Sequence, residues 1–350
     1  MKTIKGRGRA LFAIEVLSTK PTTFTFIFLF FMAATAFLLS CVKEEEVNGR
    51  ETVSIGLESK AEVLASHGTL DLFIYNMDNL QRLDSHSRMD FDGAFPQRIE
   101  AGSRGGMKKA VVLANWPEEE LKDWSKVHTL TSVFCVMSYL GDDNPGRPRM
   151  TGTATVSAGS VNTIISMQTL SARIKIASLQ CDFSGRAYAG ETIKNARVYL
   201  TNVCTSTTIS PDDNPGYSFA NIGGLSEGDM EAFGAREMLC RKIYGEIGPS
   251  KMVTDFSLYC YPASLKEERP GQPVMKLVLE GEIGGKRYYY PVPIGEYTGG
   301  KVNRNTTYQI DLLITRLGTD DPEAAVAPEA VKVGVQVLPW EDTSEQTIDF

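Results

Sequence analysis

The sequence has little of what catalytic and metal-binding sites are usually built from. It contains only three histidines, His67, His86 and His128, and no two cysteines in a C-x-x-C spacing. The zinc-protease helix motif, the serine elbow of hydrolases and the phosphate-binding loop are all absent from it. Its carboxylates are plentiful, but the two carboxylates of a glycosidase are recognised by their distance in the folded protein, so their number in the sequence does not indicate such a pair. The sequence therefore predicts no enzyme, no metal site and no cofactor.

Basic side chains are too few for a protein that binds nucleic acid. The full chain has 36 Lys and Arg against 43 Asp and Glu. Because residues 1–40 hold five basic side chains and one acidic one, the remainder has a net charge near −11. Affinity for nucleic acid comes from clustered Lys and Arg that neutralise phosphates, and the sequence has no such cluster. We therefore exclude nucleic acid as a partner.

The one long apolar run is short for a membrane span. Residues 24–39 form a run of about 16 apolar residues behind a basic segment, which is typical of a secretory signal. The run ends in Leu38-Leu39-Ser40-Cys41, which resembles a bacterial lipobox, and this predicts signal cleavage between Ser40 and Cys41. The cysteine would then carry acyl chains, palmitate among them. The alternative is an uncleaved membrane anchor with an incidental cysteine.

Three glutamates at residues 44–46 follow this cysteine. A stop-transfer helix is usually followed by basic residues, so the acids favour a cleaved signal. They also resemble the surface-export signal of Bacteroidetes lipoproteins. We predict a signal peptide over residues 1–40 and a lipidated acidic linker over 41–50.

The other five cysteines stand apart from one another in the sequence. Three of them lie in or beside apolar strand-like runs, where a cysteine behaves as a small buried hydrophobe. Core packing is favoured over a disulfide, and the pairing state stays open for Cys135, Cys181, Cys204, Cys240 and Cys260.

From residue 51 onward the sequence predicts short alternating strands separated by turns. Val53, Ile55 and Leu57 share one face of the first strand, as a half-buried strand requires. After two lysines, residues 110–114 are continuously apolar, which suits a strand covered on both faces. Gly284-Gly285 predicts a two-residue hairpin turn. The pattern is mainly β and predicts two antiparallel β-sandwich domains, over residues 51–180 and 181–350.

The last predicted strand is rich in valine. In residues 331–340, four valines share one face, opposite Lys332, Gly334 and Gln336, and a tryptophan follows. These positions are Val331, Val333, Val335, Val337 and Trp340.

Residues 117–134 predict the single helix of the N-terminal domain. Pro117 suits the first helical position, and residues 118–120 are glutamates at the positive end of the helix dipole. Leu121, Trp124 and Val127 recur at helical spacing and are expected to pack on the sheet.

Two further patterns have a structural and a binding interpretation. The motif DDNPG occurs at residues 142–146 and 212–216, but it lacks the spacing of a calcium loop and is typical of turns. The run Tyr288-Tyr289-Tyr290 could form a sugar-stacking platform, although alternation along a strand favours packing.

Several stretches, in this order, resemble the fimbrillin family of Bacteroidales, which are type V pilus subunits with anchor and tip relatives. They are TLDLFIYN, KKAVVLANWP, MTGTATVS, LSARIKIASL, NRNTTYQIDLLITRLGTDDP and the C-terminal VQVLPWEDTSEQTIDF. The resemblance implies two Greek-key, transthyretin-like β-sandwich domains in a surface lipoprotein that polymerises by strand donation. In the stalk subunits of the family, an arginine-specific protease removes the first strand with the lipid. The C-terminal segment of another subunit then fills the groove.

Within this resemblance, residues 51–59 match the first strand and residues 331–340, with the tail to residue 350, match the donor. The stretch from residue 51 to residue 81 has no arginine, so cleavage at Arg82 would also remove the second strand. Cleavage at Arg50 would release the lipid and leave the first strand in place. This favours an anchor-type or accessory subunit, held in the outer membrane by the lipid on Cys41.

Three alternatives remain open at this point. A protease of another specificity, cutting near Lys60, would make the chain a polymerising stalk subunit. The chain could instead be a tip adhesin or a surface glycan-binding lipoprotein, with Trp116, Trp124 or the tyrosine run as the platform. The expected partners are other fimbrial subunits and the outer membrane, with host proteins or glycans as further candidates.

Overall fold

The computed structural model describes residues 49–59, 67–212, 216, 218–232, 236–264 and 273–340. The chain divides into two compact units between Gly49 and Arg50, and the fold below is that of the second unit. Ser40, Cys41 and Lys60 lie outside the described residues. None of the helices in the described ranges has the length and apolar character needed to cross a membrane.

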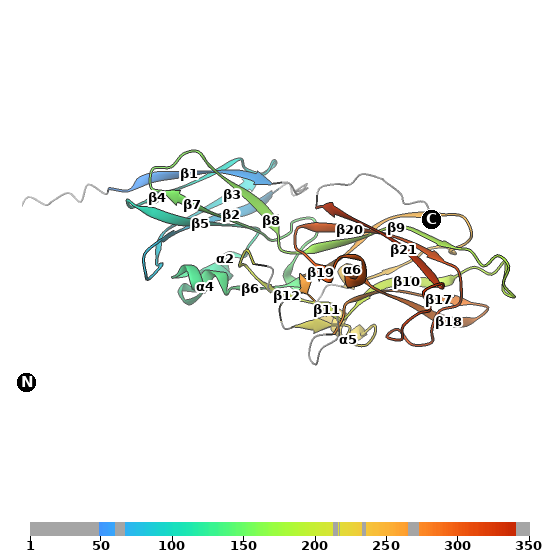
Figure 1. Cartoon of the computed structure of the whole chain (residues 1–350). Helices are drawn as coiled ribbons and strands as arrows, with labels where there is room; N and C mark the ends of the chain where they lie inside the picture. The colour runs from blue at the N-terminus through green and yellow to red at the C-terminus, as the bar shows by residue number, and fades with distance from the viewer. Residues whose placement is uncertain are drawn as a thin grey trace, which may run out of the picture. The chain divides into compact units, whose positions relative to one another are not determined.

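The first half of this unit is built on one seven-stranded sheet (Figure 1), ordered β3-β2-β5-β7-β8-β1-β4. Its strands are β1 (Glu51–Ser59), β2 (His67–Asn76), β3 (Leu83–Asp92), β4 (Arg98–Ser103), β5 (Met107–Ala114), β7 (Met150–Ser157) and β8 (Thr163–Thr169). The two end strands meet where Ser103 of β4 donates a hydrogen bond to Asp84 of β3 over 2.9 Å. The sheet therefore curls nearly into a barrel.

Strand β5 is covered on both faces, as its continuous apolar run predicts. Ala110 and Val112 face the inner core of the curled sheet, together with Leu72 of β2. Val111 and Leu113 face the opposite way, into the core beneath the helices. The curled sheet thus has one filled interior and one face covered by helices.

Three short helices replace the predicted single helix over residues 117–134. They are α2 (Glu118–Leu121), α3 (Trp124–Val127) and α4 (Leu130–Phe134). Asp123 accepts a hydrogen bond from the Ser125 amide and starts α3, and a capping box between Thr129 and Ser132 starts α4. These caps break the helical phase, because each fixes its own residue in extended backbone.

The break changes which side chains reach the sheet. Leu121 and Val127 are buried as predicted, but the side chain of Trp124 is 63% exposed, so that part of the prediction is wrong. Tyr75 of β2 instead holds the helices, since its hydroxyl donates to the Val127 carbonyl over 2.8 Å.

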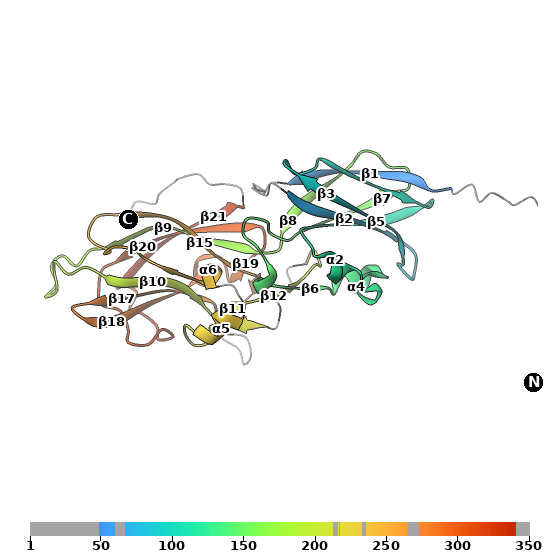
Figure 2. The same cartoon turned by 180° about the vertical axis from the view of Figure 1, so that it is seen from behind.

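The second half contains two four-stranded sheets, seen from both sides in Figures 1 and 2, whose buried side chains belong to one apolar core. One sheet is ordered β14 (Cys240–Lys242), β10 (Lys194–Thr201), β17 (Lys276–Ile283) and β18 (Lys286–Pro293). The other is ordered β15 (Met252–Cys260), β9 (Ala172–Cys181), β20 (Thr306–Ile314) and β21 (Val331–Pro339). The hairpin between β17 and β18 turns at Gly284 and Gly285, both at positive φ, which confirms that prediction.

Short elements complete the described chain. Three two-stranded pairs join β6 (Met137–Tyr139) to β12 (Ser206–Thr208), β11 (Val203–Cys204) to β13 (Phe219–Ala220) and β16 (Ala263–Ser264) to β19 (Lys301–Val302). The remaining helical turns are η1 (Leu140–Asp142), α5 (Glu227–Ala232), α6 (Arg236–Leu239) and α7 (Ile294–Tyr297).

The predicted all-antiparallel pairing is wrong at two places. Strand β1 runs parallel to β8, and β9 runs parallel to β20. Alternating side chains show that a strand has a buried face but say nothing about the direction of its neighbour. The chain passes from the first half to the second between Thr169 and Ala172. Thr169 ends β8, which belongs to the seven-stranded sheet, and Ala172 begins β9, which belongs to a sheet of the second half.

Candidate functional site

Strand β1 is an interior strand with a hydrogen-bonded neighbour on each side. It pairs antiparallel with β4 from Glu51↔Ser103 to Gly56↔Arg98. On its other side it pairs parallel with β8 from Ile55↔Thr163 to Ser59↔Met167. Loss of this strand would therefore leave a slot with two open backbone edges, those of β4 and β8. Open edges of this kind are templates for pairing with another chain.

The side chains of β1 fill the interior of the curled sheet. Val53 and Ile55 are fully buried and Leu57 is 8% exposed, in one cluster with residues of β2 and β5. Burying one such side chain contributes about 1.5–3 kcal/mol, so the three together are comparable to the whole stability of many domains. A slot without β1 would be apolar as well as unpaired.

One polar residue of β1 is also buried, which its alternation does not predict. The Ser54 hydroxyl donates to the Glu100 carboxylate over 2.8 Å and accepts from the Arg98 guanidinium over 3.0 Å. Both partners lie on β4, so the polar face of β1 is covered by the side chains of its neighbour. This contact adds a side-chain bond to the backbone ladder.

Arg50, the predicted processing position, directly precedes β1 and its side chain is exposed. A protease could reach it without opening the sheet. The residues that follow β1, from 60 to 66, lie outside the described ranges, and so does the alternative cleavage position near Lys60.

Strand β21, the predicted donor strand, is placed differently from β1. It pairs antiparallel with β20 from Thr306↔Pro339 to Ile314↔Val331 and forms the end of its sheet. Val331, Val333 and Val335 are partly buried against the main core, whereas Val337 is 55% exposed. The valine face of β21 therefore packs against the core at its first three valines and is exposed to solvent at the fourth.

Trp340 is the last described residue, and its side chain is more deeply buried than the valines before it. Its side chain is 5% exposed, and the Arg173 guanidinium lies 5.1 Å from its ring centroid. The Trp340 carbonyl accepts hydrogen bonds from Arg173 and from the Thr307 hydroxyl. Arg173 was not singled out in the sequence, although a charged residue inside an apolar strand such as β9 signals a specific partner.

The two segments meet in one cluster of buried side chains. Trp340 belongs to the same apolar cluster as Val53, Ile55 and Leu57, and its ring centroid lies 6.1 Å from that of Tyr259 on β15. The end of the C-terminal strand is thus packed against the interior that β1 fills.

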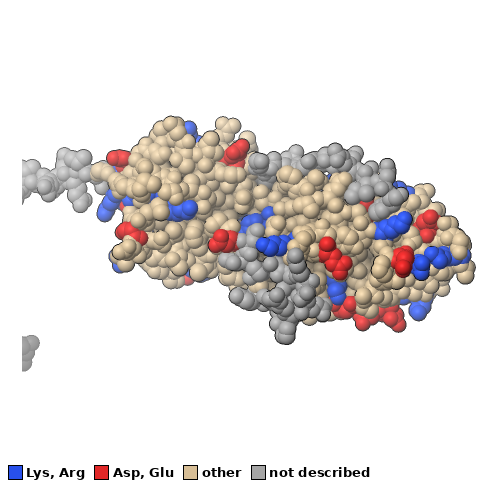
Figure 3. Space-filling model, in the orientation of Figure 1, with Lys and Arg blue, Asp and Glu red and all other residues tan. Residues whose placement is uncertain are grey.

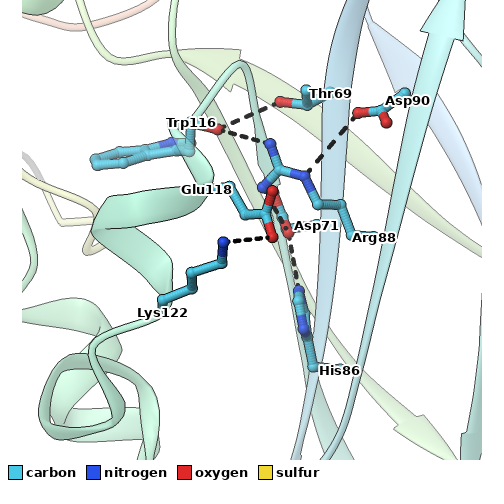
Figure 4. A network of polar contacts seen from close by, with 8 residues as sticks. All are labelled: Thr69, Asp71, His86, Arg88, Asp90, Trp116, Glu118 and Lys122. Carbon is cyan, nitrogen blue, oxygen red and sulfur yellow. Dashed lines mark hydrogen bonds and ion pairs between the residues drawn. The ribbon is translucent and has the colours of Figure 1, made fainter.

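A charged network lies on the outer side of β2 and β3 (Figure 4). The buried Asp71 carboxylate accepts hydrogen bonds from Arg88, at 2.9 and 3.2 Å, and lies 2.8 Å from His86 Nε2. The His86 ring stacks on Phe73, with centroids 4.4 Å apart. Among the described residues there is no group of acidic, histidine and cysteine side chains that could hold a metal ion. The contacts of the network join β2 to β3.

Three of the five cysteines in the described residues are core residues. Cys181, Cys204 and Cys260 are buried with free thiols, and Cys135 and Cys240 are also free. Burial raises the pKa of the Cys181 thiol to about 11, with a hydrogen bond to the backbone opposing the shift. Thiols of this kind are unreactive near neutral pH.

The aromatic residues considered as sugar platforms are only partly available. Tyr290 is fully buried and its hydroxyl donates to the Arg316 carbonyl over 3.1 Å, while Tyr288 and Tyr289 are half-buried. Trp116 is 1% exposed. Trp124 is exposed and lies beside His128, with ring centroids 6.2 Å apart.

On the face drawn in Figure 3, blue and red side chains are interspersed among neutral ones, and its described residues form no continuous basic stripe.

The fold matches solved structures of fimbrial and adhesion proteins over most of the chain. The fimbrilin FimA from Porphyromonas gingivalis W83 matches with a TM-score of 0.62 and 16% identity, over 83% of this chain and 97% of that chain. A proposed cell adhesion protein from Parabacteroides distasonis ATCC 8503 matches with a TM-score of 0.62 and 15% identity, over 85% and 98% of the two chains.

The tip fimbrial protein Mfa3 from Porphyromonas gingivalis, truncated at its C-terminus, matches with a TM-score of 0.50 and 12% identity. That match covers 83% of this chain and 100% of that chain. No protein-family model matches the sequence, and no curated protein matches it. At these identities the matches show a fold like that of fimbrial subunits, and the predicted resemblance to fimbrillins is confirmed at the level of the fold.

Proposed function

We propose that this protein is a structural, non-enzymatic subunit of a cell-surface fimbria that engages its neighbours by β-strand donation. The observation that carries the proposal is the position of β1 between β4 and β8. A strand at that position can be exchanged for one from another chain, because the incoming strand gains two backbone ladders and an apolar slot. The likeness in fold to FimA and Mfa3 supports the same assignment.

The finer proposal is an anchor-type or accessory subunit in the outer membrane. The sequence after β1 has no arginine before Arg82, which lies beyond β2, so an arginine-specific cut cannot release β1 alone. Cleavage at the exposed Arg50 would release the linker and leave β1 in its slot. That cut would also remove the lipid on Cys41. In the anchor proposal the chain is therefore uncut: it keeps its own first strand and stays attached through the lipid on Cys41, since several acyl chains hold a protein stably in a bilayer.

The donor role is proposed for β21 and the tail that follows it. As an end strand with one neighbour, β21 can leave its sheet by breaking a single ladder. In this proposal the chain consists of two β-sandwich-like domains, over residues 51–180 and 181–350, with the donor at the C-terminal end of the second. Its partners are other fimbrial subunits.

Intact mass spectrometry of the protein from purified outer membranes, with N-terminal mapping, tests the anchor assignment. The expected species begins at a lipidated Cys41 and retains residues 51–59. A terminus between residues 59 and 69 would show that β1 is removed, and the chain would then be a stalk or tip subunit. An unlipidated terminus with residues 1–40 intact would overturn the lipoprotein assignment itself.

A further inference from the structure

A polar hollow of about 280 Å³ opens at one end of the curled sheet. Its walls come from the start of β2, from Arg88 on β3, from residues 115–117 after β5 and from the loop over residues 142–149 that leads into β7. We infer that this hollow binds one neutral sugar residue of a surface glycan. This is a function beyond strand exchange, and it does not depend on it.

Buried polar atoms without partners gather around this hollow. Within the part of the chain that the structure describes, Asn115 Oδ1, Trp116 Nε1 and Arg149 Nε make no hydrogen bond. Two of these residues are almost fully buried, with 1% of Trp116 and 3% of Arg149 exposed. These atoms have almost no accessible surface, and a buried polar group without a partner costs free energy. A ligand that draws them to the wall of the hollow by small side-chain movements would supply the missing bonds. One acceptor and two donors suit hydroxyl groups, which both donate and accept.

The charges around the hollow favour a neutral ligand over an anion. Arg88 is neutralised by the buried Asp71, and its second amino group donates to the Trp116 carbonyl over 3.1 Å (Figure 4). Arg149 is paired with Glu120 over 3.1 Å.

At the rim, Arg147 and Asp142 are both exposed, and neither makes an ion pair with another described residue. One cation and one anion remain available there, and they leave no excess of positive charge to attract an acidic ligand. Both can bond to sugar hydroxyls.

The hollow is formed before any ligand arrives. Asp143 Oδ1 accepts hydrogen bonds from the amides of Asn144 and Arg149, both over 3.0 Å, and this closes the loop on itself. Asn115 Nδ2 donates to the Pro148 carbonyl over 2.9 Å and ties the loop to the end of β5. A pre-formed site loses little affinity to ordering, which matters most for a small polar ligand.

The size of the hollow limits the ligand to one ring. Pockets for small molecules usually hold about 300–1,000 Å³, and this hollow, at about 280 Å³, is slightly smaller than that range. The Arg149 guanidinium lies 4.5 Å from the Trp116 ring centroid and shields the indole, so the ligand is held by hydrogen bonds rather than by aromatic stacking.

The test is a glycan array probed with the full mature lipoprotein in a detergent that carries no sugar headgroup. Hits are then titrated by saturation-transfer NMR with the free monosaccharide. We expect binding to neutral hexose-containing glycans. We also expect affinity to fall about tenfold in Arg147→Ala and in Asp142→Ala, since each removes a charged hydrogen-bonding group.

Two further variants make the test specific to this hollow. Trp116→Phe keeps the buried ring but removes the Nε1 donor, and it should weaken binding without changing the fold. Arg186→Ala removes an exposed arginine far from the lining residues in sequence and should leave affinity unchanged.

Three outcomes would overturn the inference. They are no binding on the array, binding confined to acidic glycans, and binding that survives these variants but is lost in Tyr289→Ala. If cells that carry Arg147→Ala form normal fimbriae, assembly does not depend on this hollow. That conclusion holds whether or not the variant binds glycan.

Discussion

Strands β1 and β21 are the two segments proposed to take part in strand exchange, and they differ in position within their sheets and in burial. The first lies inside its sheet, with two paired neighbours and with its apolar side chains buried. The second lies at the end of its sheet, with one paired neighbour and half-buried valines. The slot of an acceptor must bind its inserted strand strongly, while a donor strand must be able to leave its own sheet. The difference in pairing therefore suits the two proposed roles.

The largest effect is expected for a charge placed in the β1 slot. Ile55→Asp removes a fully buried side chain and buries a carboxylate, so it should destabilise the first sheet by about 4 kcal/mol or more. Urea unfolding followed by circular dichroism would measure this. Ile164→Asp on the neighbouring β8 is the control, because that side chain is 66% exposed and its replacement should cost less than about 0.5 kcal/mol. Equal losses in the two variants would mean that β1 does not fill the core.

A somewhat smaller effect is expected at Trp340, the buried end of the C-terminal segment. Trp340→Ala should cost about 3–5 kcal/mol, since it empties a core position and removes the ring that Arg173 covers. Hydrogen exchange should show faster opening of both β21 and β1, because the two share one apolar cluster. Trp124→Ala, at an exposed position, should change neither rate. Faster exchange in β21 alone would separate the two segments.

Single valines of β21 should have a modest effect on stability and a large effect on assembly. Val333→Asp disturbs a half-buried position, with an expected cost of about 1–3 kcal/mol that leaves the first sheet folded. Fimbriae should nevertheless fail to form, as seen by electron microscopy of the cells. Lys332→Ala is the matched control, because its side chain is exposed on the opposite face of the same strand. Fimbriae of normal length in the Val333 variant would refute strand donation by β21.

The smallest effect concerns pH and the loop before β7. Burial raises the pKa of Asp143 to about 6, against hydrogen bonds from the Arg149 and Asn144 amides. A raised pKa means that the folded state holds the proton more tightly. The stability from this group is therefore complete below about pH 4 and is lost as the pH rises through 6, with a total of about 1–3 kcal/mol.

Asp143→Asn keeps the shape of the side chain and should abolish this pH-dependent difference. The quantity to measure is the free energy of unfolding of both proteins at pH 4 and pH 7. The expected result is a parent that loses stability relative to the variant as the pH rises. An unchanged difference between them would mean that Asp143 titrates normally in the fold.

Much of the strand pattern could be predicted from the sequence. The alternation at Val53, Ile55 and Leu57 predicts their burial, and the run in β5 predicts a strand covered twice. The caps at Asp123 and Thr129 were also present in the sequence, but the helical spacing of Leu121, Trp124 and Val127 concealed them. A periodic pattern of apolar residues does not show where a helix is interrupted, since interruption depends on local hydrogen bonds.

The candidate sites depended more strongly on tertiary structure. The sequence pointed to β1 and to residues 331–340, yet it gave no indication that one is interior and the other terminal in its sheet. The partnership of Trp340 with Arg173 joins residues far apart in the chain. The polar hollow joins the start of β2, the end of β5 and a loop whose DDNPG motif is typical of a turn.

The sequence by itself determined that this is a mainly β chain with a buried first strand and a valine-rich last strand, and it predicts a lipoprotein signal. These properties follow from composition and from a period of two residues, which are local. Only the tertiary structure decided which strands are neighbours, which of them run parallel, and which unpartnered polar atoms come together. These features arise when the seven-stranded sheet closes and the two four-stranded sheets pack together. Both events bring together residues that are far apart in the sequence, which no local pattern connects.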